Sequence, residues 1–222
     1  MTEFQIKFNK PPYHTREGRN KFIYSVYKDY LSKSVLNIGG GGEKYLLKYI
    51  NKKTNHFEID KFGSPDLIFD LEKDDLNRIK TNEYETVVCT DVLEHIDNFH
   101  EVFDHILRIA KKDIIISLPN CYKIFISSIN NPKAFKHYGL PFGNPDHRHK
   151  WFFSFTDIEN FFRENENHKD YKIDHIIPLG IHYKKPFYVK LFFKLIKIFF
   201  GNDLYTNLKV TTAWVKLTKT EK

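Results

Sequence analysis

The chain has 222 residues, with 35 Lys or Arg against 28 Asp or Glu, so its formal net charge is +7. A hydrophobic content of 41% excludes a disordered protein, and the length suits one domain with a single core. Two cysteines, Cys89 and Cys121, are too few for a disulfide framework or a structural zinc site, which predicts a reducing, cytoplasmic location. The N-terminus lacks the apolar region of a secretion signal, and no apolar run is long enough to span a bilayer.

Short apolar runs alternate with helical patterns through the first half of the chain. The helical patterns cover residues 19–31, 45–50 and 98–110. The runs that we expect to form strands are residues 34–38, 56–59, 67–69, 86–89 and 114–117. Because parallel strands covered on both faces read as continuous apolar runs between amphipathic helices, this order predicts an open α/β sheet over residues 34–120, with helices on both faces.

The second half departs from that alternation. Residues 121–153 lack clear periodicity and are rich in Pro, Gly, Asn and His, which predicts a lid or acceptor loop. A helix is expected to start at residues 154–157. Residues 171–177 and 211–217 are candidates for an antiparallel pair of strands at the edge of the sheet.

A glycine turn with an acidic partner is the strongest local signal. Gly39 to Gly42 follow a buried strand, where the lack of a Cβ lets a ligand approach the backbone. Asp60 ends the next strand 21 residues after Gly39, close to the offset expected for a carboxylate that binds ribose hydroxyls. Glu58 is the other acid there, but its side chain is expected on the opposite face. Glu43 would repel a pyrophosphate, so the pattern favours a cationic or zwitterionic ligand that carries an adenosine.

Residues 35–43 resemble motif I of the class I S-adenosylmethionine-dependent methyltransferases. Further stretches resemble that family's later motifs in the same order, namely 57–60, 65–71, the V-L-E-H-I stretch within 87–96, and 117–120. The resemblance implies a Rossmann-like α/β fold, S-adenosylmethionine as cofactor and S-adenosylhomocysteine as product. The cofactor-binding residues that it implies are Asn37, Gly39, Gly41, Asp60, Asp70 and Asp91. Asn37 and Glu43 depart from the family pattern, which usually has Asp and Gly at these positions.

The whole chain is expected to form one methyltransferase domain. Its expected parts are an N-terminal cover (1–33), a cofactor-binding core (34–120), the lid or acceptor loop (121–153) and a C-terminal helix and strand portion (154–222). Residues 138–153 also resemble a smaller branch of the family that is often associated with bacterial surface-polysaccharide biosynthesis. That second resemblance implies methyl transfer to a hydroxyl or phosphate-type oxygen of a sugar, nucleotide sugar or capsule precursor. A methyltransferase acting on RNA or protein, and a non-catalytic module that only binds the cofactor, are the competing hypotheses.

Two histidines are candidates for the base that an oxygen acceptor needs, because the imidazole pKa lies near neutral pH. His95 follows the fourth strand, and His149 lies in the lid. His147, Arg148 and Lys150 are candidates for binding an anionic or sugar-based acceptor, since a guanidinium pairs with phosphate or carboxylate in a forked geometry. The structural alternatives are that His95 holds the backbone at a helix start and that Arg148 and Lys150 are solvated charges of the loop.

The eleven histidines also allow chance clusters that resemble metal sites. One such set is His137, Asp146, His147 and His149. Its H-x-H spacing lacks a firm third ligand, so no metal site is assigned to it, and whether a metal takes part stays open at this point. At the N-terminus, a set of polar residues either covers the cofactor's carboxylate or forms a surface helix; it comprises Tyr13, His14, Arg16 and Arg19.

The basic excess lies at the ends of the chain. The net charge is +4 over residues 1–33, −4 over 34–183 and +7 over 184–222, so the core is slightly acidic, which suits a cationic sulfonium. Residues 186–200 predict a helix with Lys190, Lys194 and Lys197 in one stripe. Its wide apolar surface favours packing on the sheet or a homodimer contact over peripheral contact with the inner membrane surface. The stretch contains no Arg, so nucleic acid is not the favoured partner.

Overall fold

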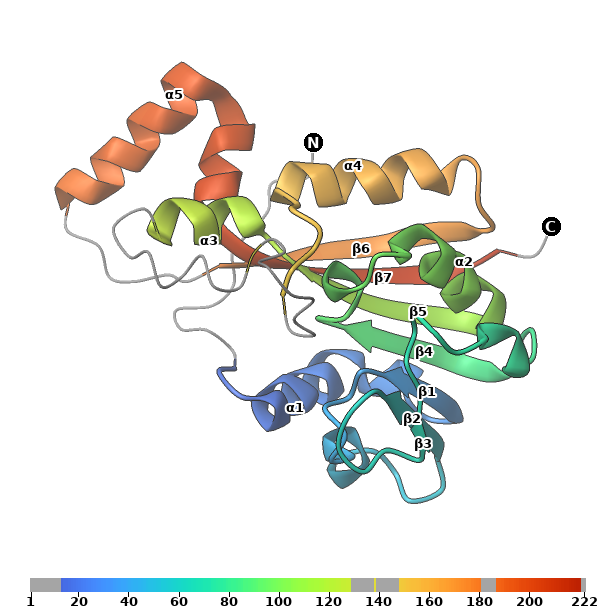
Figure 1. Cartoon of the computed structure of the whole chain (residues 1–222). Helices are drawn as coiled ribbons and strands as arrows, with labels where there is room; N and C mark the ends of the chain where they lie inside the picture. The colour runs from blue at the N-terminus through green and yellow to red at the C-terminus, as the bar shows by residue number, and fades with distance from the viewer. Residues whose placement is uncertain (1–12, 129–137, 139–147, 181–186, 221–222) are drawn as a thin grey trace.

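The computed structural model (Figure 1) contains one seven-stranded sheet and describes residues 13–128, 138, 148–180 and 187–220. The strands are β1 (Ser34–Ile38), β2 (Asn55–Asp60), β3 (Leu67–Ile68), β4 (Tyr84–Thr90), β5 (Ala110–Pro119), β6 (Tyr171–Gly180) and β7 (Val210–Lys219). Their order across the sheet is β3-β2-β1-β4-β5-β7-β6. β7 pairs antiparallel with both β5 and β6, whereas the other pairs are parallel. The predicted sheet, mostly parallel with an antiparallel C-terminal pair, is confirmed.

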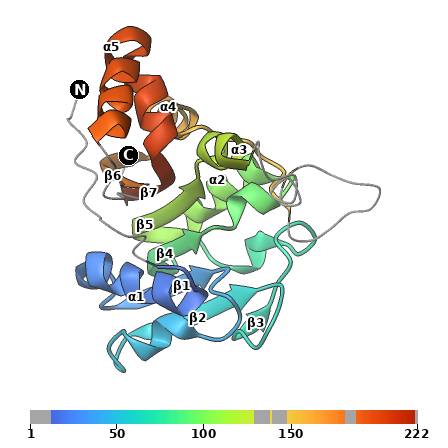
Figure 2. The same ribbon diagram turned by 90° about the vertical axis from the view of Figure 1, so that its left-hand side faces the viewer.

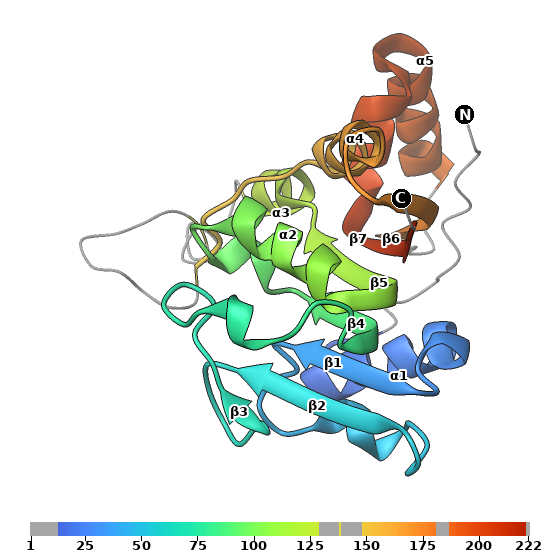
Figure 3. The ribbon, with the colours of Figure 1, turned by 90° about the vertical axis from the view of Figure 1, so that its right-hand side faces the viewer.

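Helices cover both faces of the sheet, as Figure 3 shows. α1 (Arg16–Tyr27) packs on one face, and α2 (Phe99–Ile109) and α4 (Phe155–Glu166) pack on the other. Successive strand residues point to opposite faces, so each strand supplies both cores. Leu36 and Val87 belong to the core under α2 and α4, whereas Val35 and Val88 belong to the core under α1.

Two helix starts follow from their capping residues. The Thr15 side chain accepts a hydrogen bond from the backbone N–H of Gly18, which starts α1 ahead of the predicted position. Ser154 and Asp157 form a reciprocal capping box at α4, and this confirms the predicted helix start. Each cap satisfies backbone donors that would otherwise have no partner within the helix.

Two segments differ from the sequence prediction. The helix expected over 45–50 is a single 3₁₀ turn, η2 (Tyr45–Lys48), because Lys44 adopts a left-handed conformation and holds the chain in the glycine turn. The predicted loop 121–153 begins with a helix, α3 (Cys121–Ser128), whose first turn is held by Asn120. Residues 129–137 and 139–147 of that loop lie outside the described residues.

The C-terminal helix α5 (Phe187–Lys209) is broken at Gly201, whose φ is 85°. Figures 1 and 2 show its first part projecting away from the sheet, beyond α3 and α4. Its second part is tied down through Asn207, whose side-chain oxygen accepts from Phe155 N at 2.7 Å and whose backbone oxygen accepts from Asn120 at 2.9 Å. Within the described residues, no helix is both long enough and apolar enough to cross a bilayer.

Two long-range contacts connect the last strand to the rest of the chain. The Trp214 indole of β7 packs against Phe22 of α1 and donates a hydrogen bond to the Tyr13 hydroxyl at 3.1 Å. Lys216 of β7 is fully buried, and its ammonium lies 2.7 Å from the Asp113 carboxylate and 2.9 Å from that of Asp174. β7 therefore holds together elements from the start, the middle and the end of the chain.

Candidate active site

A cavity of about 290 Å³ lies at the carboxyl ends of β1, β2 and β4. Five of the six predicted cofactor-binding residues line it, namely Gly39, Gly41, Asp60, Asp70 and Asp91. The cavity wall also includes Arg16, Arg19, Lys61, Phe62, Val92 and His95. Since the carboxyl ends of parallel strands form the ligand crevice of open α/β sheets, this cavity is the candidate active site.

The glycine turn leaves room for a ligand against the backbone. Gly39 has a φ of 69°, and a Cβ there would lie 2.1 Å from the Val92 side chain. Gly41 has a φ of 100°, and a Cβ there would lie 2.9 Å from Arg16. A side chain at either position would be strained and would collide with the cavity wall. These two positions therefore require glycine.

The Asp60 carboxylate is fixed by the turn that it faces. It accepts hydrogen bonds from Gly41 N at 3.0 Å and from Phe62 N at 2.9 Å. A carboxylate offers about four lone-pair positions, so both oxygens keep capacity for the hydroxyls of a ligand. Asp60 is thus held in one orientation on the cavity wall, as the binding of a ribose requires.

Arg19 and Asp91 form an ion pair across the cavity wall. The guanidinium Nη1 lies 2.8 Å from Asp91 Oδ2, while Asp91 Oδ1 accepts from the Ser117 hydroxyl at 2.6 Å. The Arg19 Nε–H is buried and has no hydrogen-bond partner. Arg16, from the same helix, also lines the cavity, so this part of the predicted N-terminal cover lies over the site. In contrast, Tyr13 packs on Trp214.

Asp70 lies beside two cations at another part of the wall. Its carboxylate is 3.3 Å from the Lys61 ammonium and 3.5 Å from that of Lys73. Partial burial acts to raise the Asp70 pKa, but the Glu72 backbone N–H and the Lys61 ammonium outweigh it and lower the pKa. Asp70 is therefore ionised near neutral pH. The sequence did not single out Lys61 or Phe62 as part of the site, because neither belongs to a recognisable pattern.

Asn37 lies behind the glycine turn and is absent from the cavity wall that the described residues form. Its side chain is buried on the α1 face, where Nδ2 donates to Glu58 Oε2 at 2.8 Å. The backbone N–H of Lys44 donates to the other Glu58 oxygen at 3.3 Å. Asn37 thus supports the turn from beneath, and this placement differs from the direct cofactor contact that we expected. Glu58 and Asp60 are two residues apart on β2, and both carboxylates accept hydrogen bonds from the same turn, from Lys44 N and Gly41 N. The expectation that Glu58 lies on the opposite face from Asp60 is therefore wrong, because residues two apart on a strand share a face.

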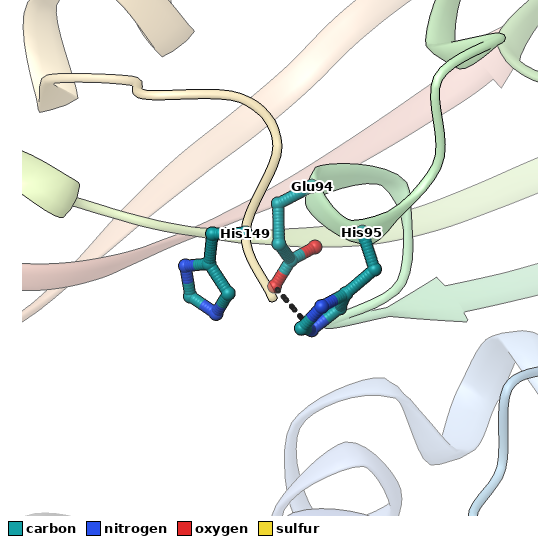
Figure 4. Close-up of side chains that lie close together, drawn as sticks. All are labelled: Glu94, His95 and His149. Atoms are coloured by element: carbon teal, nitrogen blue, oxygen red, sulfur yellow. Dashed lines mark ion pairs between the residues drawn. The ribbon is translucent and has the colours of Figure 1, made fainter. Parts of the chain in front are cut away.

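His95, His149 and Glu94 lie close together (Figure 4). His95 lies on the 3₁₀ turn η4 (Leu93–His95), and its ring centroid is 4.7 Å from that of His149. The backbone N–H of Lys150 donates to Glu94 O at 2.7 Å, which anchors the segment that carries His149. Both base candidates therefore meet at one place, but only His95 is part of the cavity wall.

Glu94 is the buried member of this cluster, with its side chain 1% exposed. Its Oε1 lies 3.9 Å from His95 Nε2, and its Oε2 has no hydrogen-bond partner. Burial, and then the charge of Asp91, raise the pKa of Glu94 well above its usual range. One ligand atom from each of Glu94, His95 and His149 lies within 4.8 Å of the others, so the three could hold a metal ion. The alternative cluster partners His137, Asp146 and His147 lie outside the described residues.

The predicted acceptor-binding residues are engaged with other parts of the protein. The Lys150 side chain is 8% exposed, and its ammonium contacts the carboxylates of Glu72 and Asp97 at 2.5 and 2.8 Å. Arg148 donates to the backbone oxygen of Tyr138 at 3.1 Å. His147 lies outside the described residues. Cys89 is buried in β4, as expected of a packing residue.

Comparisons with known proteins agree with this geometry. Residues 16–166 match the family described as "Methyltransferase domain". A search of curated protein sequences found no match. Many solved structures have a similar fold. The methyltransferase domain of bacterial CtHen1 is 17% identical with a TM-score of 0.52, and the alignment covers 92% of this chain and 98% of that one.

Two further structures are similar. A SAM-dependent methyltransferase from Archaeoglobus fulgidus is 17% identical with a TM-score of 0.54, over 92% of this chain and 95% of that one. The 1,6-didemethyltoxoflavin-N1-methyltransferase of Burkholderia thailandensis, solved with S-adenosylhomocysteine, is 10% identical with a TM-score of 0.52, over 93% and 79% of the chains. At these identities the similarity concerns the fold.

Proposed function

We propose that this chain, which belongs to the class I S-adenosylmethionine-dependent methyltransferases, transfers a methyl group to an oxygen of a small polar acceptor. The single observation that carries the proposal is the position of His95. Its imidazole is part of the wall of the cavity that Gly39, Asp60 and Asp91 also line, and it stands beside His149. An oxygen acceptor needs a base at the cavity wall to remove its proton, whereas an amine acceptor that is already neutral depends less on such a base.

The cavity wall fits the cofactor. The two glycines open the backbone to an adenosine and methionine chain, and Asp60 presents a fixed carboxylate to the ribose. The buried Arg19 Nε–H without a partner is a donor for the methionine carboxylate. When bound, the cofactor supplies an activated sulfonium methyl group. The chain's own contribution is then to hold the acceptor oxygen in line with that methyl and to remove its proton.

We assign the removal of the acceptor's proton to His95, which has His149 and Glu94 as neighbours. His95 Nε2 is 3.9 Å from Glu94 Oε1, and the imidazolium formed after proton transfer would in turn favour the ionised form of this buried carboxyl. His149 is held near Glu94 and His95 by the bridge to Tyr138 and by the hydrogen bond from Lys150 N to the backbone oxygen of Glu94. As acceptor we propose a sugar, a nucleotide sugar or another precursor of surface polysaccharide, which the resemblance of residues 138–153 supports.

A second role for the cluster is favoured by the unpartnered Oε2 of Glu94. A buried carboxylate oxygen without a donor is costly, and a divalent cation held by Glu94, His95 and His149 would satisfy it. One carboxylate and two imidazoles suit Zn²⁺, Mn²⁺ or Co²⁺. Such an ion would lower the pKa of an acceptor hydroxyl and so perform the same task as the base.

Calorimetry and turnover test the proposal. S-adenosylhomocysteine should bind to the purified chain, and the absence of binding at millimolar ligand would contradict the enzymatic function. Turnover is then followed as S-adenosylhomocysteine release with a panel of nucleotide sugars. His95→Ala should lower turnover by roughly a hundredfold or more while S-adenosylhomocysteine affinity stays within about threefold.

The matched control is His168→Ala, because His168 is exposed in the turn that follows α4 and lies outside the cavity wall. It should leave turnover unchanged. Near-normal turnover of both His95→Ala and His149→Ala would exclude a catalytic base at this position. Turnover that appears only with RNA, and that falls steeply with salt, would replace the proposed acceptor by a nucleic acid. Ligand binding without turnover on any acceptor would indicate a non-catalytic module.

A further inference from the structure

The first part of α5, residues 187–200, exposes an unusual amount of apolar surface. Eight large side chains are between 41% and 79% exposed, namely Phe187, Tyr188, Leu191, Phe192, Leu195, Ile198, Phe199 and Phe200. Single exposed apolar residues are common on protein surfaces, but a continuous group of this size on one helix marks an interaction surface. In the described residues of this segment, only Ile196 is buried.

The segment has three distinct faces when its residues are placed at about 100° intervals around a helix. Ile196 is buried and Val189 and Phe193 are half-buried, so this side faces the protein. Seven of the exposed apolar residues, all except Phe200, occupy one arc of about 140°. The three lysines at 190, 194 and 197 form a narrow stripe between that arc and the protein-facing side.

The sequence alone did not separate these faces. We expected the wide apolar surface to pack on the sheet or on a second copy of the chain. The structure assigns only one narrow side to packing, where the Phe193 ring contacts the Tyr205 ring of the second part of α5, with 6.4 Å between the ring centroids. The remaining apolar arc is bordered by cationic side chains, which is the pattern of a helix that lies in a membrane interface.

The positive charge of the segment favours an anionic partner. Residues 187–202 contain no Asp or Glu, and residues 184–222 carry nine basic against two acidic groups. We propose that residues 187–200 bind to the surface of an anionic phospholipid bilayer, with the apolar arc in the acyl boundary and the lysines on the headgroup phosphates. Long lysine side chains can extend from beside an apolar arc to that level. In a dimer formed by this arc, the two lysine stripes would lack an acidic counterpart on the helix.

The surroundings of the helix extend this surface. Tyr122 and Phe125 of α3 are also exposed, and α3 contacts α5. α3 starts directly after β5, at the same end of the sheet as the cavity. Gly201 separates the projecting part of α5 from the part that Asn207 fixes, and a Cβ at Gly201 would meet nothing within 4 Å. Substitutions in the projecting part should therefore leave the strands that carry the active site undisturbed.

Vesicle flotation with the full-length chain tests the inference, and it needs neither acceptor nor turnover. The chain should bind vesicles that contain phosphatidylglycerol much more tightly than vesicles of phosphatidylcholine alone, and added salt should weaken that binding. Lys190→Gln/Lys194→Gln/Lys197→Gln should weaken binding on the order of a hundredfold, as expected for three lysines at an anionic surface. Leu191→Ser/Phe199→Ser should abolish it.

A charge-matched variant provides the control. Lys52→Gln/Lys53→Gln/Lys80→Gln removes three exposed lysines far from α5 and should bind vesicles nearly as well as the unchanged chain. All variants should keep the circular dichroism spectrum and S-adenosylhomocysteine affinity of the unchanged chain, which shows that they are folded. Equal binding of both triple variants, or equal binding to neutral and anionic vesicles, would overturn the inference. So would a concentration-dependent dimer that Leu191→Ser/Phe199→Ser dissociates, since the occupant would then be a second copy.

Discussion

Asn37 of β1 and Glu58 of β2 are paired in register, and the Asn37 amide donates to the Glu58 carboxylate at 2.8 Å. Both side chains lie directly beneath the glycine turn, since a Cβ at Gly40 would be 2.1 Å from Glu58 Oε2 and 2.2 Å from Asn37 Nδ2. The departure from the family pattern at position 37 thus has a local reason. A carboxylate there would face the buried carboxylate of Glu58, whereas an amide supplies the donor that Glu58 needs.

Asn37→Asp should therefore weaken both the fold and the site. Two buried carboxylates at this distance cannot both be ionised without a large cost, so we expect a loss of about 1–3 kcal/mol in the free energy of unfolding. S-adenosylhomocysteine affinity should fall with it, because the turn rests on the pair. Urea unfolding and calorimetry measure the two effects. Asn37→Asp/Glu58→Gln restores one donor and one acceptor, so it should recover most of the unfolding free energy and most of the S-adenosylhomocysteine affinity. A double variant as unstable and as weakly binding as Asn37→Asp would contradict this explanation.

The pH dependence of stability should carry a contribution from Glu58. Burial, only partly offset by the N–H of Lys44 and the Asn37 amide, raises the pKa of the Glu58 carboxyl above its usual range. The folded chain then retains a proton that the unfolded chain has lost, so the free energy of unfolding should fall as pH rises from about 4.5 through the raised pKa. The slope in that window is at most about 1.4 kcal/mol per pH unit. Glu58→Gln should remove this contribution when unfolding is measured across the pH range, and an unchanged slope would contradict it.

A cation titration tests the second role of the Glu94 cluster. Co²⁺ added to chelator-treated protein should bind at one site, and the visible spectrum should report a nitrogen and oxygen environment. Glu94→Gln and His149→Ala should each weaken binding by roughly ten- to a hundredfold or more, while His168→Ala binds as the unchanged chain does. If Glu94→Gln binds Co²⁺ as well as the unchanged chain, the ion lies elsewhere.

The buried Lys216 allows a test of how much its ion pairs contribute to the stability of the sheet. Its ammonium is fully buried between Asp113 and Asp174. Lys216→Met leaves Asp113 buried without a cation and should cost about 3–5 kcal/mol of unfolding free energy. Lys216→Met/Asp113→Asn removes the unpaired charge and should recover a large part of that loss in thermal or urea unfolding. A cost below about 1 kcal/mol for Lys216→Met alone would show that the pair contributes little.

The sequence predicted the elements whose signals are local. Short β-branched runs located the strands, and the Ser154–Asp157 pattern located the start of α4, because apolar periodicity and capping act over a few residues. The glycine turn and Asp60 were predicted from the residues themselves, since strand ends of a parallel sheet meet at one edge. Asp91 was implied by the resemblance to the methyltransferase family.

The remaining features depend on contacts between distant residues. His95 and His149 were separate candidates, and long-range backbone contacts bring them together, among them the hydrogen bond from Lys150 N to the backbone oxygen of Glu94. The role of Asn37 required the register of β1 with β2, which no local pattern specifies. The short η2 turn in place of a helix required the left-handed conformation of Lys44, a residue type that rarely adopts it.

The contact between Trp214 and α1 has a consequence for synthesis. The helix that brings Arg16 and Arg19 to the cavity is synthesised long before β7, the strand that carries the indole on which it packs. Because the wall on that side is complete only when β7 has joined the sheet, we expect a chain that ends before β7 to bind the cofactor poorly. Cofactor binding is thus a property that the chain gains only after β7 has been made and has joined the sheet.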